Sequence, residues 1–336
     1  MKKFVIVITI SLTFLFIFSV WGCGQAQETL IHAYKPSRSI HAVKTVENIK
    51  LHDSKRNRDV PLKIFYPDGA GPFPVIIFSH GAGGSKEGYA YLGKYWAGFG
   101  YVSIHPTHYG SDTSIFTKGK LRENLKALKK CVDDTKNWEN RPKDVSFIID
   151  SFDKIEKEVP GLKGKLDRNH IGLAGHSYGA FTTIAVAGAL IDFPGNKDRT
   201  LADKRVKAFI AMSPQPSGMF GFDKNTWKNI KRPVMLMTGT KDKTFSKKPP
   251  STRLESYNGM PAGNKYLLNI GKANHFTFSG GFGNMIKAKP SHINYIKTAS
   301  LAFWDAYLRD IKKAKDYLRS DSLVKYSSGD IDYRKK

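Results

Sequence analysis

The segment 171–180 constrains the fold of this chain more than any other. A short apolar run, Ile171–Ala174, precedes the letters Gly-His-Ser-Tyr-Gly, and small and apolar residues that favour a helix follow them. A serine between a strand and a helix in this way lies on a sharp turn that lifts its hydroxyl above the sheet. Gly175 and Gly179 flank Ser177 where backbone segments crowd and a Cβ would clash. We therefore expect Ser177 to be a nucleophile; the alternative is a plain turn whose serine caps the helix.

Short apolar runs alternate with helical patterns through residues 45–310, without an internal repeat or a polar linker. The expected strands are Thr45–Leu51, Val60–Tyr66, Pro74–Ser79, Tyr101–His105, Ile171–Ala174, Val206–Met212, Pro233–Thr238 and Tyr266–Ile270. The expected helices are Lys86–Gly98, Arg141–Val159, Tyr178–Leu190 and Ser291–Leu308. This alternation indicates an α/β fold in a single domain, with a mostly parallel central sheet covered by helices on both faces. Ligands of such sheets bind beyond the carboxyl ends of the strands.

The first 23 residues have the pattern of an export signal. Two lysines follow Met1, and Phe4–Val20 is apolar apart from threonine and serine. This stretch also approaches the length of a membrane span, so an uncleaved anchor is the alternative. Gly22 and Cys23 resemble the end of a bacterial lipoprotein signal, in which lipid is attached to the cysteine. We therefore expect an exported protein of the cell envelope that is tethered through an N-terminal lipid or anchor, or is otherwise periplasmic or secreted.

Three further segments are polar. Residues 24–44 are irregular and are expected to form a tether. Residues 109–140 are partly helical, which indicates a surface excursion. Arg141 and Asp144, just after it, are expected to form a structural ion pair. Residues 311–336 are rich in lysine and are expected to form a basic C-terminal tail that frays.

The chain is strongly basic, with 54 lysines and arginines against 29 acidic residues and a formal net charge of +25. Its lysines are scattered, and no aromatic-basic motif of nucleic-acid binding stands out. We therefore interpret the charge as a solvated surface and expect no nucleic-acid partner. The sequence also lacks His-Glu-x-x-His, paired Cys-x-x-Cys and a phosphate-binding loop, so neither a metal nor another cofactor is expected.

A serine hydroxyl needs a base to take its proton and a third group to orient that base. Where the serine occupies such a strand-to-helix turn, the acid and then the histidine follow it in the chain. Only two histidines follow Ser177, and these are His275 and His292. His275 lies in a short loop after the last expected strand, whereas His292 begins the final helix. We therefore predict His275 as the general base; the alternative is an ordinary loop histidine.

The orienting acid has more candidates, namely Asp192, Asp198, Asp203, Asp223, Asp242 and Glu255. Asp242 differs from the others because it follows a buried apolar run, Pro233–Thr238, and a tight turn. A carboxylate at the end of a strand can be held rigidly against a histidine. We therefore predict Asp242 as the acid; the alternative is a turn aspartate of the kind that is common beside glycine.

Attack by a serine on a carbonyl needs two backbone N–H donors for the oxygen that becomes charged. One donor is expected from Tyr178, the residue after the nucleophile, and the other from the glycine-rich loop that begins at Ser79. Ala82 is predicted as the second donor of this oxyanion hole, with Gly81 and Gly83 as alternatives. A glycine-rich turn without a ligand role is the structural alternative.

Six short motifs carry a resemblance to a known family, namely Phe78–Gly84, Gly100–Val102, Trp138–Val145, Gly175–Gly179, Leu236–Asp242 and Ala273–Phe276. With them, residues 45–310 resemble the serine esterases of the α/β-hydrolase superfamily. The resemblance is strongest to the dienelactone hydrolase and platelet-activating-factor acetylhydrolase-like group. It implies an α/β-hydrolase fold and hydrolysis of short acyl esters by Ser177, Asp242 and His275, without a cofactor.

Two departures from this group limit what the resemblance implies. Dienelactone hydrolases use cysteine as the nucleophile, whereas this chain has Ser177. Acetylhydrolases of the platelet-activating-factor type carry their acid after the strand that follows the nucleophile. Here that strand ends in Ala-Met-Ser-Pro at 211–214, without a carboxylate. The acid is therefore expected one strand later, at Asp242, and phospholipid specificity is not carried over.

The sequence thus predicts a serine carboxylic ester hydrolase that acts on small-molecule esters with short acyl chains through an acyl-enzyme intermediate. A lipase, phospholipase, polyesterase-like enzyme or peptidase with the same three residues is the first alternative, in which 109–140 is a lid. A non-catalytic binding protein that keeps the hydrolase fold is the second. The intact order of serine, aspartate and histidine argues against that second alternative.

Overall fold

The computed structural model describes residues 32–244, 246–282 and 286–336. The predicted signal segment 1–23, with the lipidation residue Cys23, and the first part of the predicted tether therefore lie outside the described residues. Within the described part of the chain, no helix combines the length and the apolar character that crossing a bilayer requires.

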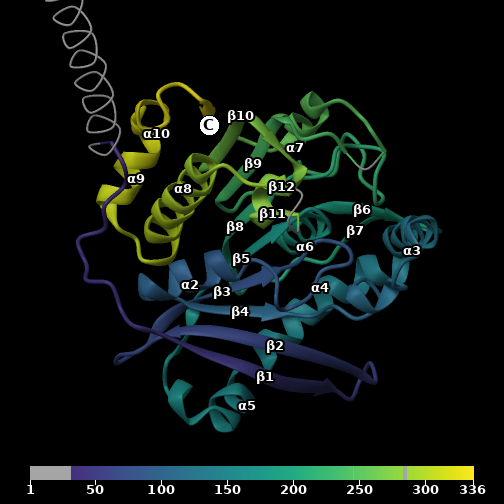
Figure 1. Ribbon diagram of the computed structural model, residues 1–336, viewed down its shortest axis with the longest axis horizontal. Helices are drawn as coiled ribbons and strands as arrows, with labels where there is room; N and C mark the ends of the chain where they lie inside the picture. Colours follow the sequence, from purple (N-terminus) through teal and green to yellow (C-terminus); the bar gives the residue numbers. More distant parts are fainter. Residues whose placement is uncertain (1–31, 245, 283–285) are drawn as a thin grey trace, which may run out of the picture.

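A central sheet organises the described chain, and its strands follow the order β1-β2-β4-β3-β5-β8-β9-β10-β13 (Figure 1). Their bounds are β1 Val43–Asp53, β2 Arg58–Pro67, β3 Phe73–Ser79, β4 Val102–Pro106, β5 Leu166–His176, β8 Val206–Met212, β9 Val234–Lys241, β10 Lys265–Asn274 and β13 Ile331–Lys335. The strands from β4 through β10 pair in parallel, and antiparallel pairs join β1, β2 and β4 on one side and β13 to β10 on the other. The carboxyl ends of the parallel strands therefore lie along one edge.

Helices cover both faces of this sheet. Their bounds are α2 Ala90–Gly98, α3 Leu121–Asp133, α4 Thr135–Asp150, α5 Phe152–Glu158, α6 Tyr178–Ala187, α7 Glu255–Gly259, α8 Pro290–Leu308, α9 Lys312–Arg319 and α10 Ser322–Tyr326. Alternate residues of β3 enter two different cores, because side chains of a strand point to opposite faces in turn. Val75 and Ile77 pack in the core that holds α4, α5 and α6, and Ile76 and Phe78 in the core that holds α2 and α8. The predicted architecture is confirmed.

Several element boundaries differ from the expectation for local reasons. The helix after Ser177 ends at Ala187 instead of Leu190, because Gly188 adopts a left-handed φ of 113° that ends the helix. A hairpin, β6 Leu190–Phe193 and β7 Asn196–Thr200, follows it. Shorter elements are η1 Thr113–Ile115, η2 Pro160–Leu162, η3 Pro250–Leu254, η4 His275–Ser279, β11 Gly281–Phe282 and β12 Ile286–Lys287.

The expectation of a frayed tail at 311–336 is wrong. The segment forms α9, α10 and β13, and β13 adds an antiparallel strand to the edge of the sheet at β10. Ala314 and Leu318 lie one helical turn apart on α9 and are fully buried, as is Leu323 on α10. The lysines that dominate the composition occupy the solvent face of α9 and conceal this apolar spacing.

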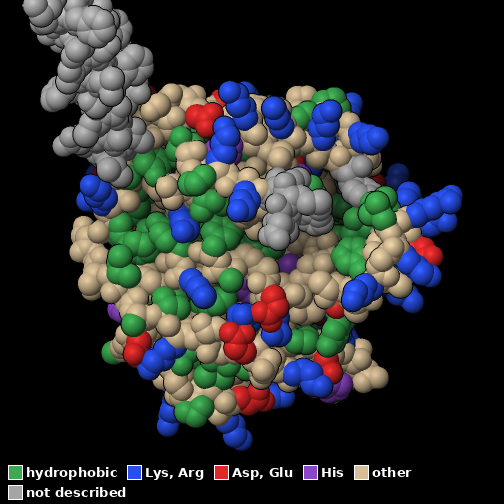
Figure 2. Space-filling view, in the orientation of Figure 1, with side chains coloured by type: hydrophobic (Ala, Val, Ile, Leu, Met, Phe, Trp, Pro, Cys, Tyr) green, Lys and Arg blue, Asp and Glu red, His purple; other side chains and the backbone are tan. Residues whose placement is uncertain are grey.

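Lysine and arginine side chains are spread over the surface rather than gathered in one large field. Figure 2 shows them across the visible face as well as around its rim, with acidic side chains most numerous below its centre. This distribution agrees with the interpretation of the charge as a solvated surface.

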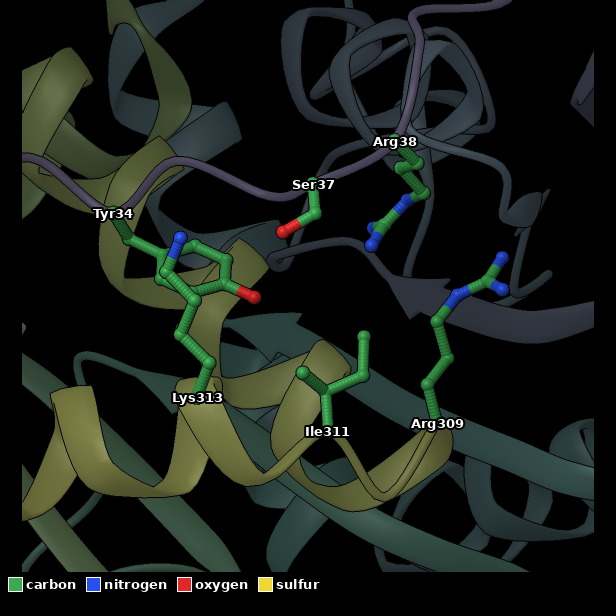
Figure 3. A pocket seen from close by; sticks show the side chains of 6 residues that line it. All are labelled: Tyr34, Ser37, Arg38, Arg309, Ile311 and Lys313. Carbon is green, nitrogen blue, oxygen red and sulfur yellow. The ribbon is translucent and has the colours of Figure 1, made fainter.

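The predicted tether is structured from its described beginning at residue 32. Tyr34 is buried and donates its hydroxyl to Asp305 Oδ2 at 2.7 Å, and Arg38 binds both carboxylate oxygens of Asp305 at 2.8 and 2.6 Å. The segment therefore packs against α8 before β1 begins. A cavity of about 340 Å³ remains beside it, lined by Tyr34, Ser37, Arg38, Arg309, Ile311 and Lys313 (Figure 3). None of these residues belongs to the predicted catalytic set.

Candidate active site

Ser177 lies on the turn that the sequence predicts, between the end of β5 and the first residue of α6. Its φ of 56° and ψ of −117° are strained for a residue with a side chain, as is common where a reactive group must be presented. A Cβ at Gly179 would collide with the carbonyl oxygen of Ser79, and one at Gly175 would collide with the backbone of Gly179. Both glycines are therefore required for β3, β5 and α6 to approach at this turn.

The structure brings Ser177, His275 and Asp242 together in one hydrogen-bonded chain. His275 follows β10 and its Nε2 lies 2.9 Å from Ser177 Oγ, while its Nδ1 lies 2.9 Å from Asp242 Oδ1. Asp242 follows β9 and is fully buried, whereas the His275 side chain is 28% exposed. Because the carboxylate can only accept, Nδ1 carries the proton, and Nε2 is free to accept the proton of the serine hydroxyl.

The carboxylate of Asp242 is held in its charged form. Burial by itself raises the pKa of Asp242, but the positive charge of Arg253 and the hydrogen bond from His275 hold it well below the usual range. Thr238 Oγ1 also donates to Asp242 Oδ2 at 3.0 Å. The acid therefore stays ionised and in a fixed orientation against the imidazole throughout the ordinary pH range.

Arg253 is the residue of this site that the sequence reasoning missed. Its guanidinium, which is 2% exposed, comes from η3 and lies 3.2 Å from Asp242 Oδ1. It also donates to the carbonyl oxygens of Ser213, Pro214, Asp242 and Lys243 at 2.9 to 3.2 Å. Arg253 thus joins the loops after β8 and β9. No periodicity or strand end distinguishes it in the sequence from the other basic residues of a polar segment.

Arg253 also lies close to the imidazole, because its Nη2 is 3.3 Å from His275 Nδ1. The proton on His275 Nδ1 points at Asp242, so Nδ1 and Arg253 Nη2 are both donors. They therefore lie close together without forming a hydrogen bond. Arg253 therefore lies against both members of the Asp242–His275 pair.

The two predicted oxyanion donors have free N–H groups within the described part of the chain. Tyr178 occupies the first position of α6, where backbone amides lack an intrahelical acceptor. In the glycine-rich loop, the Gly83 N–H donates to Ser111 O at 2.8 Å. Gly83, one of the two alternatives to Ala82, is therefore engaged elsewhere, while Ala82 and Gly81 remain as candidate donors of the loop.

The expected ion pair between Arg141 and Asp144 is wrong. Asp144 instead binds Arg56 at 2.8 Å, Arg58 at 2.9 Å and His108 at 2.9 Å. The two residues share α4, but the fully buried side chain of Arg141 extends to the glycine-rich loop, where it donates to the carbonyl oxygen of His80. Spacing along a helix indicates proximity of two side chains but not which neighbour each one reaches.

A second serine–histidine–aspartate chain lies beneath the same loop. Ser79 Oγ is 3.0 Å from His108 Nε2, and His108 Nδ1 is 2.9 Å from Asp144 Oδ2. All three residues are fully buried, and Arg141 Nη2 donates to Ser79 Oγ at 3.0 Å. No substrate can reach this serine, so the array fixes the position of the loop that carries Ala82 and is not a second active site.

Buried neutral histidines around the site make the stability depend on pH. Burial lowers the pKa of both His105 and His108 from 6.5 to about 4. Between pH 6.5 and 4 the unfolded chain binds these protons and the folded chain does not, so stability falls as the pH falls and levels off below about 4. We predict that each such histidine contributes up to about 1.4 kcal/mol per pH unit to this fall.

This dependence is measured by urea unfolding at a series of pH values. His105→Gln, which lies away from the nucleophile against Phe65 and Phe78, should flatten the decline between pH 6.5 and 4. An equally steep decline in the variant and the parent would show that His105 does not titrate in this way.

Within the described residues, no group of three histidine, cysteine or acidic side chains could hold a metal ion. The arrangement around Ser177 consists of a serine, a histidine, an aspartate and two backbone N–H groups at the carboxyl ends of parallel strands. Such an arrangement on such a sheet is characteristic of the α/β-hydrolase fold.

The chain belongs to the chlorophyllase family, whose model matches residues 32–214. This match includes Ser177 and the glycine-rich loop, while Asp242 and His275 lie beyond it. The platelet-activating factor acetylhydrolase of Cavia porcellus is 25% identical over 271 residues, which are 70% of this chain and 58% of that protein. This chain therefore aligns with less than two thirds of the length of that relative.

Among solved structures, a ferulic acid esterase from Streptomyces cinnamoneus has the same fold. It superposes with a TM-score of 0.58 at 20% identity, covering 83% of this chain and 93% of the esterase. At this identity the likeness shows the shared fold alone. It agrees with the α/β-hydrolase fold that the sequence predicts.

Proposed function

We propose that this chain is a serine carboxylic ester hydrolase that acts on short-chain acyl esters through an acyl-enzyme intermediate. The observation that carries the proposal is the hydrogen-bonded chain from Ser177 Oγ through His275 to the buried carboxylate of Asp242. The names of the relatives agree with it, since one is named an acetylhydrolase and the other a ferulic acid esterase.

In the first half-reaction, Ser177 Oγ attacks the ester carbonyl carbon while His275 Nε2 takes the hydroxyl proton. The charge that develops on the carbonyl oxygen is stabilised by the N–H groups of Ala82 and Tyr178. Asp242 stabilises the imidazolium and keeps the ring oriented. The C–O bond to the alcohol then breaks, and the alcohol leaves with the proton from Nε2, so that the acyl group remains on Ser177.

In the second half-reaction, water enters in place of the alcohol. His275 Nε2 removes a proton from this water as its oxygen attacks the acyl carbon, and the same two N–H groups bind the oxyanion. Collapse of the intermediate returns the proton to Ser177 Oγ and releases the carboxylic acid. A burst of p-nitrophenol equal to one per chain, before steady turnover of p-nitrophenyl acetate, would support this acyl-enzyme.

The acyl-chain preference is tested with p-nitrophenyl esters of increasing chain length. We expect kcat/KM to fall from acetate to the long-chain esters. A rise with chain length would instead favour the lipase or phospholipase alternative with 109–140 as a lid. Hydrolysis of peptides without hydrolysis of esters would favour the peptidase alternative.

The cellular location is a separate proposal, supported by the sequence of residues 1–23. We propose export to the cell envelope and attachment through lipid at Cys23, with residues 24–31 as a connection to the folded domain. Cys23→Ser should move the protein from the membrane fraction to the soluble fraction of the envelope. Retention of that variant in the membrane would favour the uncleaved anchor.

Arg253 is proposed as a positioning residue for the Asp242–His275 pair. In Arg253→Met, the carboxylate of Asp242 loses the buried cation at 3.2 Å that helps to fix it against the imidazole. We expect kcat to fall about tenfold with KM almost unchanged, because the base is misoriented while substrate binding is not affected. Arg253→Lys keeps the charge but cannot reach the four carbonyl oxygens, so it should recover only part of the lost kcat. A purely structural role would lower the amount of folded protein and leave the kcat of the folded fraction unchanged.

A further inference from the structure

Helix α3 presents an unusual face to solvent. Leu121 and Leu125 lie one turn apart on it and are 75% and 48% exposed, although they are large apolar side chains. Phe116, just before the helix, is 40% exposed. Three of the most exposed large apolar side chains of the described chain therefore fall within ten residues. Single exposed apolar residues are ordinary, but neighbouring ones indicate a surface that binds something.

The exposure of these leucines is not a consequence of loose packing of α3. The opposite side of the helix is fixed, because Cys131 is buried and Asn137 Nδ2 donates to its carbonyl oxygen at 3.0 Å. Trp138 Nε1 donates to Val132 O at 2.7 Å, and Asn124 exchanges hydrogen bonds with the backbone of Thr117 at 2.7 and 2.9 Å. The helix is thus held to α4 and to the preceding loop with Leu121 and Leu125 directed outward.

Cations surround the exposed leucines. Two acidic side chains of the helix, Glu123 and Asp133, are paired with Lys120 at 3.4 Å and Lys129 at 2.6 Å. The exposed cations here that have no acidic partner among the described residues are Lys118, Arg122, Lys126 and Lys130. Figure 2 shows lysine and arginine side chains projecting at the right-hand edge, where Figure 1 places α3, with apolar side chains beside them. The face therefore combines apolar contact area with uncompensated positive charge.

We propose that this face docks on an anionic lipid bilayer. The α3 surface, as we call it, consists of Phe116, Leu121, Leu125 and the cations Lys118, Arg122, Lys126 and Lys130. Leucines that enter the headgroup region between lysines that bind anionic headgroups are the pattern of helices that lie in the plane of a membrane. This contact is separate from the N-terminal lipid or anchor.

A connection to the active site follows from the chain between them. The ring of Phe116 covers Gly83 so closely that a Cβ there would overlap it, and the Gly84 and Thr113 backbones are hydrogen-bonded at 3.1 Å. Docking of the α3 surface therefore brings the loop of Ala82 towards the bilayer. If the proposed ester hydrolysis is correct, this orientation favours substrates that partition into membranes. The docking itself does not depend on catalysis.

A second copy of the chain is a less suitable partner for this face. Self-association through a two-fold interface would place the same unpaired lysines and Arg122 opposite each other, which costs free energy. A surface of anionic lipid offers opposite charge to the same cations. Charge complementarity thus favours the bilayer.

The docking is tested by amide hydrogen exchange of the full chain with vesicles of phosphatidylcholine, with and without phosphatidylglycerol. We expect slower exchange in 121–133 with the anionic vesicles only, and loss of this protection at high salt. Exchange at the helix separates docking from attachment through the N-terminus. The measurement is repeated on Ser177→Ala, in which the same protection is expected because no hydrolysis is needed.

Two pairs of variants sharpen the test. Leu121→Ser with Leu125→Ser should weaken the lipid-dependent protection about tenfold or more, whereas Ile40→Ser, at another site that is 71% exposed, should not change it. Lys126→Glu with Lys130→Glu should abolish the protection.

The equal charge change on α5, Lys154→Glu with Lys157→Glu, should preserve the protection. The proposal would be overturned if anionic vesicles left the exchange rate of residues 121–133 unchanged. It would also be overturned if the leucine variants kept the protection of the parent chain. Protection that depends on protein concentration without vesicles, together with a dimer in light scattering, would also overturn it in favour of self-association.

Discussion

Replacement of Ser177 by alanine is expected to lower the turnover of p-nitrophenyl acetate about 10³-fold or more. The variant keeps Ala82 and Tyr178 as oxyanion donors, and Asp242 and His275 stay in place, but there is no oxygen to form the acyl-enzyme. Residual turnover would come from water activated by His275 and from binding alone. Turnover of the ester at a series of substrate concentrations measures the effect.

The control for this variant is Ser54→Ala, in the exposed turn between β1 and β2. It should keep the turnover of the parent, and both variants should melt within a few degrees of it. Unchanged turnover in Ser177→Ala would place any hydrolysis of this ester at another residue.

Replacement of Asp242 by asparagine is expected to lower kcat about 10³- to 10⁴-fold. An amide can hold the imidazole in the tautomer whose Nε2 carries the proton, so the base can no longer accept from Ser177. The variant also leaves the buried cation of Arg253 without its carboxylate partner at 3.2 Å, which destabilises the site. Steady-state kinetics with KM and kcat resolved should show the loss almost entirely in kcat.

Asp144→Asn is a matched control for Asp242→Asn, because Asp144 belongs to the buried Ser79–His108–Asp144 array beneath the glycine-rich loop. This aspartate also binds a histidine Nδ1 at 2.9 Å, but it has no contact with Ser177. Its replacement should lower the free energy of unfolding by about 3 kcal/mol or more, because Arg56 and Arg58 lose their partner. The folded variant should keep kcat within about tenfold of the parent. An equal loss of kcat in Asp242→Asn and Asp144→Asn would contradict a catalytic role for the first aspartate and a structural role for the second.

The catalytic candidates were predictable because each one follows an apolar strand. Ser177, Asp242 and His275 come after β5, β9 and β10, and the ends of neighbouring parallel strands meet at one edge. The sequence was therefore enough to predict that these three side chains lie close together, although it could not give the distances between their atoms. Arg253 follows no strand, and its role depends on carbonyl groups of two other loops, so no local pattern identifies it.

The ends of the chain show a different limit. The lysines of α9 suggested a frayed tail, yet Ala314 and Leu318 supply the apolar spacing that seats the helix. At the other end, Tyr34 and Arg38 dock on Asp305, more than 260 residues away in sequence. Contacts of this kind depend on a partner that only the folded chain provides, and hydrophobic periodicity does not report them.

Mass spectrometry after treatment with a fluorophosphonate tests the central claim most directly, because only an activated serine reacts with this probe. We predict one adduct per chain on the peptide that contains Ser177, its loss in His275→Ala, and its retention in Ser79→Ala, whose serine has a similar histidine partner but is buried. An adduct on another residue, or none on the folded parent chain, would contradict the account.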